Sequence, residues 1–219
     1  MRYFELKATK PDTMEKTTFI TQKHLETAYT YTEYRTMLDE LLARNQTTGT
    51  KQTPELVHYA KLNIQRMHRW DKTAVLNKSL IEKLKLVKDK WIWLVLTEGW
   101  CGDAAQSIPV IAKMAAVNEN IYLKLLLRDE NPEIMDQYLT NGTRSIPKLI
   151  CLQAETLTEI GTWGARPAVL QEIVIAYKKN PQIPYSEFTE TIHAWYARDK
   201  AEHLQHEFEE LIMKWSQRQ

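Results

Sequence analysis

Two almost unbroken apolar segments constrain the fold of this chain more than any other feature. They are Trp91–Thr97 and Ile121–Leu127. A strand that is buried on both faces is apolar throughout, whereas a strand with one wet face alternates between apolar and polar residues. Both segments therefore predict central strands of a sheet that helices cover on its two sides.

The segments around these two strands alternate between helix and strand. A helix is expected after Cys101, and Asn131-Pro132-Glu133 is typical of the start of a short one. Pro147–Gln153 and Leu157–Trp163 predict two strands joined by a tight polar turn, and Pro167–Lys179 predicts an amphipathic helix. The resulting order, βαβαββα over residues 91–180, predicts an α/β sheet with helices on its faces.

Residues 1–90 are predicted to form a helical N-terminal extension. Tyr34, Leu38, Leu41 and Leu42 make one helical stripe. Thr53-Pro54-Glu55 combines an N-cap, a first-turn proline and a first-turn acid, which is typical of a helix start. The segment Ser79–Glu82 fits a capping box for a third, short helix.

Residues 181–219 are predicted to form a C-terminal helix packed on the body. The segment follows Pro181 and Pro184, which indicate a linker, and it carries a long apolar stripe from Phe188 to Trp215. We favour packing of this stripe on the rest of the molecule. The alternative is that the helical flanks form the surface of a homodimer or bind a partner.

The composition is that of an ordinary globular protein. Apolar residues make up 43% of the 219 residues, charged residues make up 26%, and the formal net charge is +1. A nearly neutral chain lacks the field that attracts nucleic acid or an anionic membrane, so neither is expected as a partner. The apolar runs are too short to span a bilayer, and Met1–Phe4 leads into a polar stretch, unlike a secretory signal. Two cysteines are too few for a disulfide framework, so we expect a reducing, cytoplasmic setting.

No pattern of ligands indicates a metal or a cofactor. His203 and His206 are three residues apart, but the two cysteines are not paired as a zinc site requires. The few glycines form no phosphate-binding loop. We therefore expect neither a metal nor a cofactor.

One group of motifs resembles the thioredoxin family. Trp100-Cys101-Gly102-Asp103-Ala104, at the end of a predicted strand and the start of a helix, resembles the thioredoxin active-site motif. Pro109 lies where thioredoxins carry the proline inside the active-site helix, and Gly142–Pro147 resembles the segment that ends in the family's cis-proline. Gly164-Ala165 matches a further family position. The resemblance covers residues 90–180 and implies a thioredoxin-like central sheet, and the whole chain is similar to uncharacterised members of that family.

The motif also departs from the family in two places that bear on function. Thioredoxins have Cys-x-x-Cys, whereas Ala104 stands at the second cysteine position here. Many members carry a buried acid six residues before the first cysteine, where this chain has Val95. The departures put the usual dithiol cycle in doubt and leave Cys101 as a single reactive thiol.

The ionisation of Cys101 depends on two opposing effects. The positive end of a helix stabilises a thiolate by up to about 2 kcal/mol. The carboxylate of Asp103, about 6 Å away, disfavours the thiolate by roughly 0.7 to 2.8 kcal/mol. The two effects are comparable, so the sign of the shift in pKa stays open. Asp103 has an alternative role, which is to accept hydrogen bonds from the first turn of the helix.

Cys151 is not expected to form a disulfide with Cys101. It lies four residues beyond Pro147 on a predicted strand, which places it roughly 13 Å further along the sheet. A disulfide requires Cα atoms within about 7 Å of each other. We therefore predict that Cys151 is a buried core residue.

The function that these residues predict is monothiol exchange by a thioredoxin-like oxidoreductase. Cys101 would attack a disulfide of a protein or a small thiol compound, and an external reducing thiol would release the mixed disulfide. Trp100, Gly102, Asp103, Ala104, Ile146 and Pro147 would form the substrate groove. Glu98 is a candidate proton acceptor.

Two alternatives stay open. The first is a non-catalytic binding or adaptor module that uses the thioredoxin fold as a scaffold, because fold does not determine function. The second concerns Arg66–Trp70, a basic segment that could receive the carboxylates of a small thiol. Its other interpretation is a helix C-terminus where cations complement the helix dipole.

Overall fold

The computed structural model describes residues 19–217 and contains one four-stranded mixed sheet. The strands are β1 (Trp91–Thr97), β2 (Ile121–Leu127), β3 (Lys148–Gln153) and β4 (Glu159–Gly164), in the spatial order β2-β1-β3-β4. β1 is parallel to β2 and antiparallel to β3, and β4 is antiparallel to β3. This topology confirms the predicted α/β class with a thioredoxin-like sheet.

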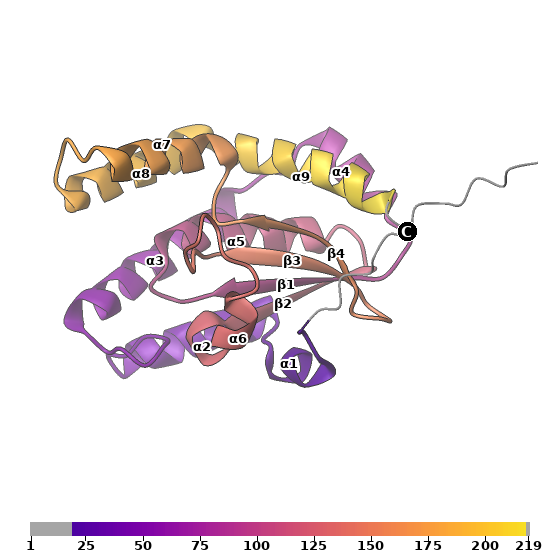
Figure 1. Ribbon diagram of the computed structural model, residues 1–219, viewed down its shortest axis with the longest axis horizontal. Helices are drawn as coiled ribbons and strands as arrows, with labels where there is room; N and C mark the ends of the chain where they lie inside the picture. The colour runs from indigo at the N-terminus through magenta and orange to yellow at the C-terminus, as the bar shows by residue number, and fades with distance from the viewer. Residues whose placement is uncertain (1–18, 218–219) are drawn as a thin grey trace, which may run out of the picture.

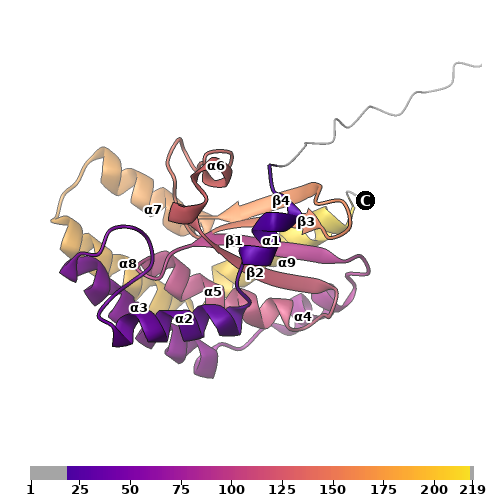
Figure 2. The same ribbon diagram turned by 90° about the horizontal axis from the view of Figure 1, so that it is seen from below.

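Helices cover both sides of this sheet (Figures 1 and 2). Four of them precede it: α1 (Gln22–Thr27), α2 (Tyr31–Ala43), α3 (Pro54–Thr73) and α4 (Lys78–Lys85). Within the sheet region lie α5 (Gly102–Ala115), a 3-10 turn (Arg128–Glu130), α6 (Pro132–Met135) and α7 (Ala168–Lys179). The chain then continues into α8 (Tyr185–Asp199) and α9 (Glu202–Ser216). In Figure 1, α4 and α9 lie side by side on one side of the sheet, and α1 and α6 lie on the other.

The central position of β1 in the sheet explains why the segment Trp91–Thr97 is almost entirely apolar. Every residue of Trp91–Thr97 is buried. Trp93 packs edge-on against Phe208 of α9, with ring centroids 5.3 Å apart, and Trp91 meets Trp215 at 6.2 Å. Helix α9 therefore covers one face of the sheet through aromatic contacts.

Two expectations for the flanking helices are wrong. Ser79 does not cap α4: that helix begins at Lys78 after Asn77, and the Ser79 hydroxyl donates to Glu209 Oε1 at 2.6 Å. The single long C-terminal helix is two helices, because Lys200 and Ala201 both adopt left-handed backbone angles with φ of 53° and 64°. No glycine or proline marks this break.

Other helix signals are confirmed. The Thr53 side chain accepts a hydrogen bond from the backbone of Leu56, and Pro54 occupies the first turn of α3. Thr30 caps α2 in the same manner. The division into residues 1–90, 91–180 and 181–219 stays a prediction, and the Met1–Phe4 segment lies outside the described residues. In the part of the chain that the structure describes, no helix has the length and apolar character needed to span a bilayer.

The aromatic contacts of α9 lead to a stability prediction. Replacing Trp215, which is 1% exposed, by Ala leaves a cavity between α9 and β1. We expect the free energy of unfolding to fall by about 3 to 5 kcal/mol, the usual cost of removing a buried aromatic ring. Urea unfolding followed by circular dichroism measures this change.

Met213→Ala is the matched control, because Met213 lies on the same helix and is 49% exposed. Its expected effect is within about 0.5 kcal/mol of zero. A loss below about 1 kcal/mol for Trp215→Ala would contradict the observed packing of α9.

Candidate functional site

Cys101 lies where β1 passes into α5. It is the N-cap residue of α5, and its backbone N–H donates to Glu98 O at 3.1 Å. The turn before it is held from two sides: Gly99 N–H donates to Thr48 Oγ1 at 2.8 Å, and Asn63 Nδ2 donates to Gly99 O at 3.0 Å. A side chain at Gly99 would collide with Leu38, 2.5 Å from the added Cβ. Contacts from α2, α3 and the loop between them therefore fix the turn that carries Cys101.

The segment before β3 faces the thiol. The Ile146–Pro147 peptide bond is cis, and Cys101 Sγ donates to Ile146 O at 3.3 Å. Only the protonated thiol can donate in this way, so the contact favours the neutral form of Cys101.

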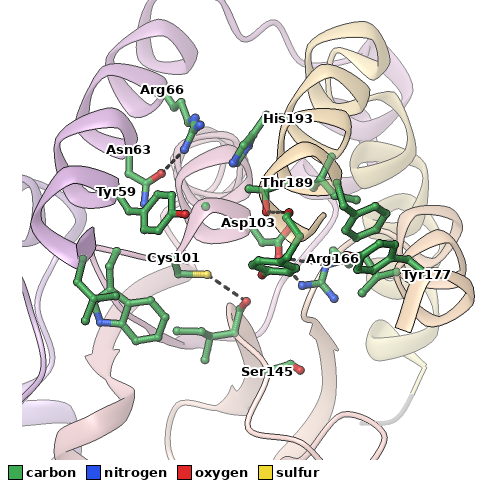
Figure 3. A pocket seen from close by; sticks show the side chains of 18 of the residues that line it. Tyr59, Asn63, Arg66, Cys101, Asp103, Ser145, Arg166, Tyr177, Thr189 and His193 are labelled. Carbon is green, nitrogen blue, oxygen red and sulfur yellow. Dashed lines mark hydrogen bonds and ion pairs between the residues drawn. The ribbon is translucent and has the colours of Figure 1, made fainter. Parts of the chain in front are cut away.

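A cavity of about 330 Å³ opens above Cys101 between α3 and α8 (Figure 3). Of the residues predicted from the sequence, six line it: Arg66, Trp100, Cys101, Gly102, Asp103 and Ile146. Ala104, Pro147 and Glu98 are not among its lining residues. α3 contributes Tyr59, Asn63 and Arg66, and α8 contributes Thr189 and His193 among others. The helices outside the 91–180 region therefore provide opposite walls of the site.

Asp103 is bound by two partners from distant parts of the chain. Arg166, in the segment before α7, donates to Asp103 Oδ2 through two nitrogens. The Tyr196 hydroxyl of α8 donates to Asp103 Oδ1 at 2.8 Å. Asp103 therefore ties α8 to the start of α5. The alternative role expected for Asp103, capping of the first helical turn, is not what these side-chain contacts show.

Burial decides the ionisation of Cys101. Removal of the thiol from water is the largest effect and, together with the negative charge of Asp103, it raises the pKa of Cys101 to about 12. The backbone N–H groups of Ala104 and Asp103 and the charge of Arg166 act in the opposite direction and are outweighed. At pH 7 about one molecule in 10⁵ then carries the thiolate, the reactive form.

Glu98 and Cys151 lie away from the cavity. Glu98 is 1% exposed, and its Oε1 accepts from the backbone of Asp129 at 2.8 Å. Burial raises the pKa of Glu98. Cys151 is fully buried in β3 opposite Trp93, and both cysteines are free thiols. Within residues 19–217 no cluster of three His, Cys, Asp or Glu residues could hold a metal ion.

Several site residues have no sequence signal that would have identified them. Tyr196 and His193 are ordinary members of an amphipathic helix, and Gln106 is one polar residue in a mostly apolar one. Arg166 has one indirect signal in the sequence: it directly follows Gly164-Ala165, which matches a position of the thioredoxin family.

Comparisons with known proteins bear on the family. A family model described as thioredoxin matches residues 49–179, which is more than half of the chain. This chain belongs to the thioredoxin family. The match begins before α3, so it includes the helix that forms one wall of the cavity as well as the sheet.

Two solved structures are similar to this chain at low sequence identity. A crystal structure of a protein of unknown function from Pseudomonas aeruginosa is 18% identical, with a TM-score of 0.51, covering 84% of this chain and 98% of that one. An HIV epitope scaffold is 17% identical, with a TM-score of 0.48, covering 85% of this chain and 97% of its own. No curated protein matches the chain.

The electrostatics of the site give a second prediction. Asp103→Asn removes a negative charge that raises the thiol pKa, and it also frees the charge of Arg166, which lowers that pKa. We expect the apparent pKa of Cys101 to fall by about 0.5 to 2 units. The pH dependence of alkylation by iodoacetamide, followed by intact-protein mass spectrometry, measures it.

Two variants control this experiment. Cys101→Ser reports any labelling of Cys151, and Asp39→Asn makes the same charge change at an exposed position of α2. An unchanged or higher pKa in Asp103→Asn would show that Asp103 does not act on the thiol.

Proposed function

We propose that this thioredoxin-family protein carries out monothiol exchange at Cys101. The observation that supports this most strongly is the position of Cys101, at the start of α5 and on the wall of a cavity of small-molecule size. Ala104 stands where a resolving cysteine would lie, and Cys151 is buried in β3. The mixed disulfide formed at Cys101 must then be resolved by an external thiol.

The remaining site residues have supporting roles in this proposal. Trp100, Gly102, Asp103 and Ile146 shape the cavity that receives the substrate, with Ala104 and Pro147 behind them. Arg128 lies 4.8 Å above the Trp100 ring, which holds the indole beside the thiol. The Trp-Cys-Gly-Asp-Ala motif would then define a monothiol group within the family. A reducing, cytoplasmic setting would supply the resolving thiol.

A specific observation favours the second candidate, a non-catalytic binding module. The raised pKa of Cys101 keeps the thiol protonated at neutral pH, so the site in this arrangement reacts slowly. A binding module would use the same cavity without any covalent step. The two functions differ in whether a disulfide adduct forms on Cys101.

Exchange is tested with bis(2-hydroxyethyl) disulfide, an uncharged reagent. The Cys101 thiolate attacks one sulfur, the S–S bond breaks, and 2-mercaptoethanol leaves with a proton from solvent. We expect a single adduct on Cys101 by intact-mass and peptide mass spectrometry. The rate should rise about tenfold per pH unit from pH 7 to 10, because the thiolate population rises in that proportion.

Cys151→Ser should behave as wild type and Cys101→Ser should form no adduct. Excess dithiothreitol should return the free thiol. Absence of any Cys101 adduct at pH 9 would contradict the exchange proposal and favour the binding module.

A further inference from the structure

The orientation of the Gln106 side chain determines the hydrogen-bonding state of His193. Gln106 Oε1 accepts from Trp70 Nε1 at 2.6 Å and from Arg69 Nη2 at 3.0 Å. The amide nitrogen of Gln106 therefore points the other way, and it lies 3.2 Å from His193 Nδ1. An amide NH₂ group only donates, so His193 Nδ1 is the acceptor.

The proton of His193 is then on Nε2. Burial and the nearby charge of Arg66 lower the pKa of His193 to about 4, so the ring is neutral at pH 7 and carries one proton. The Cε1–Nε2 edge of the ring faces Gly102: a Cβ added to Gly102 would lie 2.7 Å from Cε1 and 3.0 Å from Nε2. Among residues 19–217, no acceptor for this N–H is found.

The side chain of Arg66, on α3, approaches Gly102 from the opposite wall of the cavity. Its Nη1 donates to Asn63 Oδ1 at 2.7 Å and lies 3.9 Å from the position of a Gly102 Cβ. Arg66 is half-buried and pairs with no carboxylate of the described chain. Figure 3 shows Arg66 from α3 and His193 from α8 pointing toward one another above the start of α5. Both donors therefore converge near Gly102, the residue that follows Cys101.

The cavity has no acid available to neutralise Arg66. Asp103 is the only acidic residue among the described lining residues, and it is already bound by Arg166 and Tyr196. The other two lining arginines have acids of their own outside the cavity: Arg128 pairs with Asp129, and Arg144 pairs with Asp136. A partly desolvated guanidinium without an acid is a favourable position for an anion.

We propose that Arg66 and the Nε2–H of His193 bind a carboxylate of the small thiol or disulfide compound that exchanges with Cys101. A guanidinium fork and a neutral imidazole N–H together match the oxygens of one carboxylate. The cavity of about 330 Å³ suits a small ligand, and Tyr177 and Phe188 contribute apolar surface to its lining. This inference rests on the proposed function for its covalent step, but the anion site can be tested without that step.

The first experiment compares two reagents with the same leaving group, 2-carboxyethyl and 2-hydroxyethyl methanethiosulfonate. In both, the Cys101 thiolate attacks the sulfenyl sulfur, a mixed disulfide forms, methanesulfinate leaves, and the thiol proton passes to solvent. The ratio of the two second-order rate constants isolates the contribution of the carboxylate. We expect Arg66→Gln and His193→Leu each to lower this ratio, Arg66→Gln by about tenfold or more.

Arg198→Gln is the matched control, because it removes one positive charge from an exposed position of α8. The ratio should stay at the wild-type value there. An unchanged ratio in Arg66→Gln would overturn the anion site and leave the exchange proposal standing.

The second experiment removes the covalent step. In Cys101→Ser, binding of 3,3′-dithiodipropionate is followed through the ring signals of His193 by NMR. We expect saturable shifts that are lost in Arg66→Gln and kept in Arg198→Gln. Absence of a saturable shift would overturn the anion site even if Cys101 reacts with both reagents. Saturable binding without any reaction of Cys101 in the wild type would instead support the anion site and contradict exchange.

Discussion

The carboxylate of Asp103 joins three parts of the chain at the candidate site. Asp103 begins α5, Arg166 precedes α7, and Tyr196 belongs to α8. The apolar contacts of α8 form a small cluster with α7 that is separate from the main core, and it comprises Leu170, Val174, Phe188, Ile192 and Tyr196. The hydrogen bond from Tyr196 to Asp103 and the one between Gln106 and His193 join α8 to α5, in addition to the apolar contacts between α8 and α7.

This burial outweighs the favourable electrostatics of a helix N-terminus. Cys101 occupies the position that usually stabilises a thiolate, next to unpaired backbone N–H groups. Yet the residue is only 8% exposed and its Sγ donates to Ile146 O, and both features favour the protonated thiol. The negative charge of Asp103 also raises the pKa of Cys101. Cys101 is therefore a neutral thiol in the folded protein, and the proposed exchange would depend on its small thiolate population.

The sequence predicted the parts of the structure that depend on local pattern. The strands Trp91–Thr97 and Ile121–Leu127 were predicted with their observed bounds. Burial throughout is confirmed for Trp91–Thr97. The same expectation is wrong for Ile121–Leu127, which is an edge strand with Tyr122 45% exposed. The break at Lys200–Ala201 was missed because left-handed backbone there follows from packing and not from a glycine. His193 and Tyr196 were missed for a related reason: they reach Gly102 and Asp103 across about 90 residues of chain, and no spacing rule encodes such a contact. The sign of the Cys101 pKa shift could not be predicted, since it depends on how deeply the folded chain buries the thiol.

The most direct test of this account is the ionisation of Cys101 in the unmodified full chain. Protein with cysteine labelled at ¹³Cβ gives a chemical shift that changes on thiolate formation, and Cys101→Ser assigns the remaining signal to Cys151. We predict that the Cys101 signal does not titrate below about pH 10, because burial raises its pKa to about 12. A midpoint at or below about 8.5, the value for an exposed cysteine, would contradict the burial of the Cys101 thiol in the folded protein.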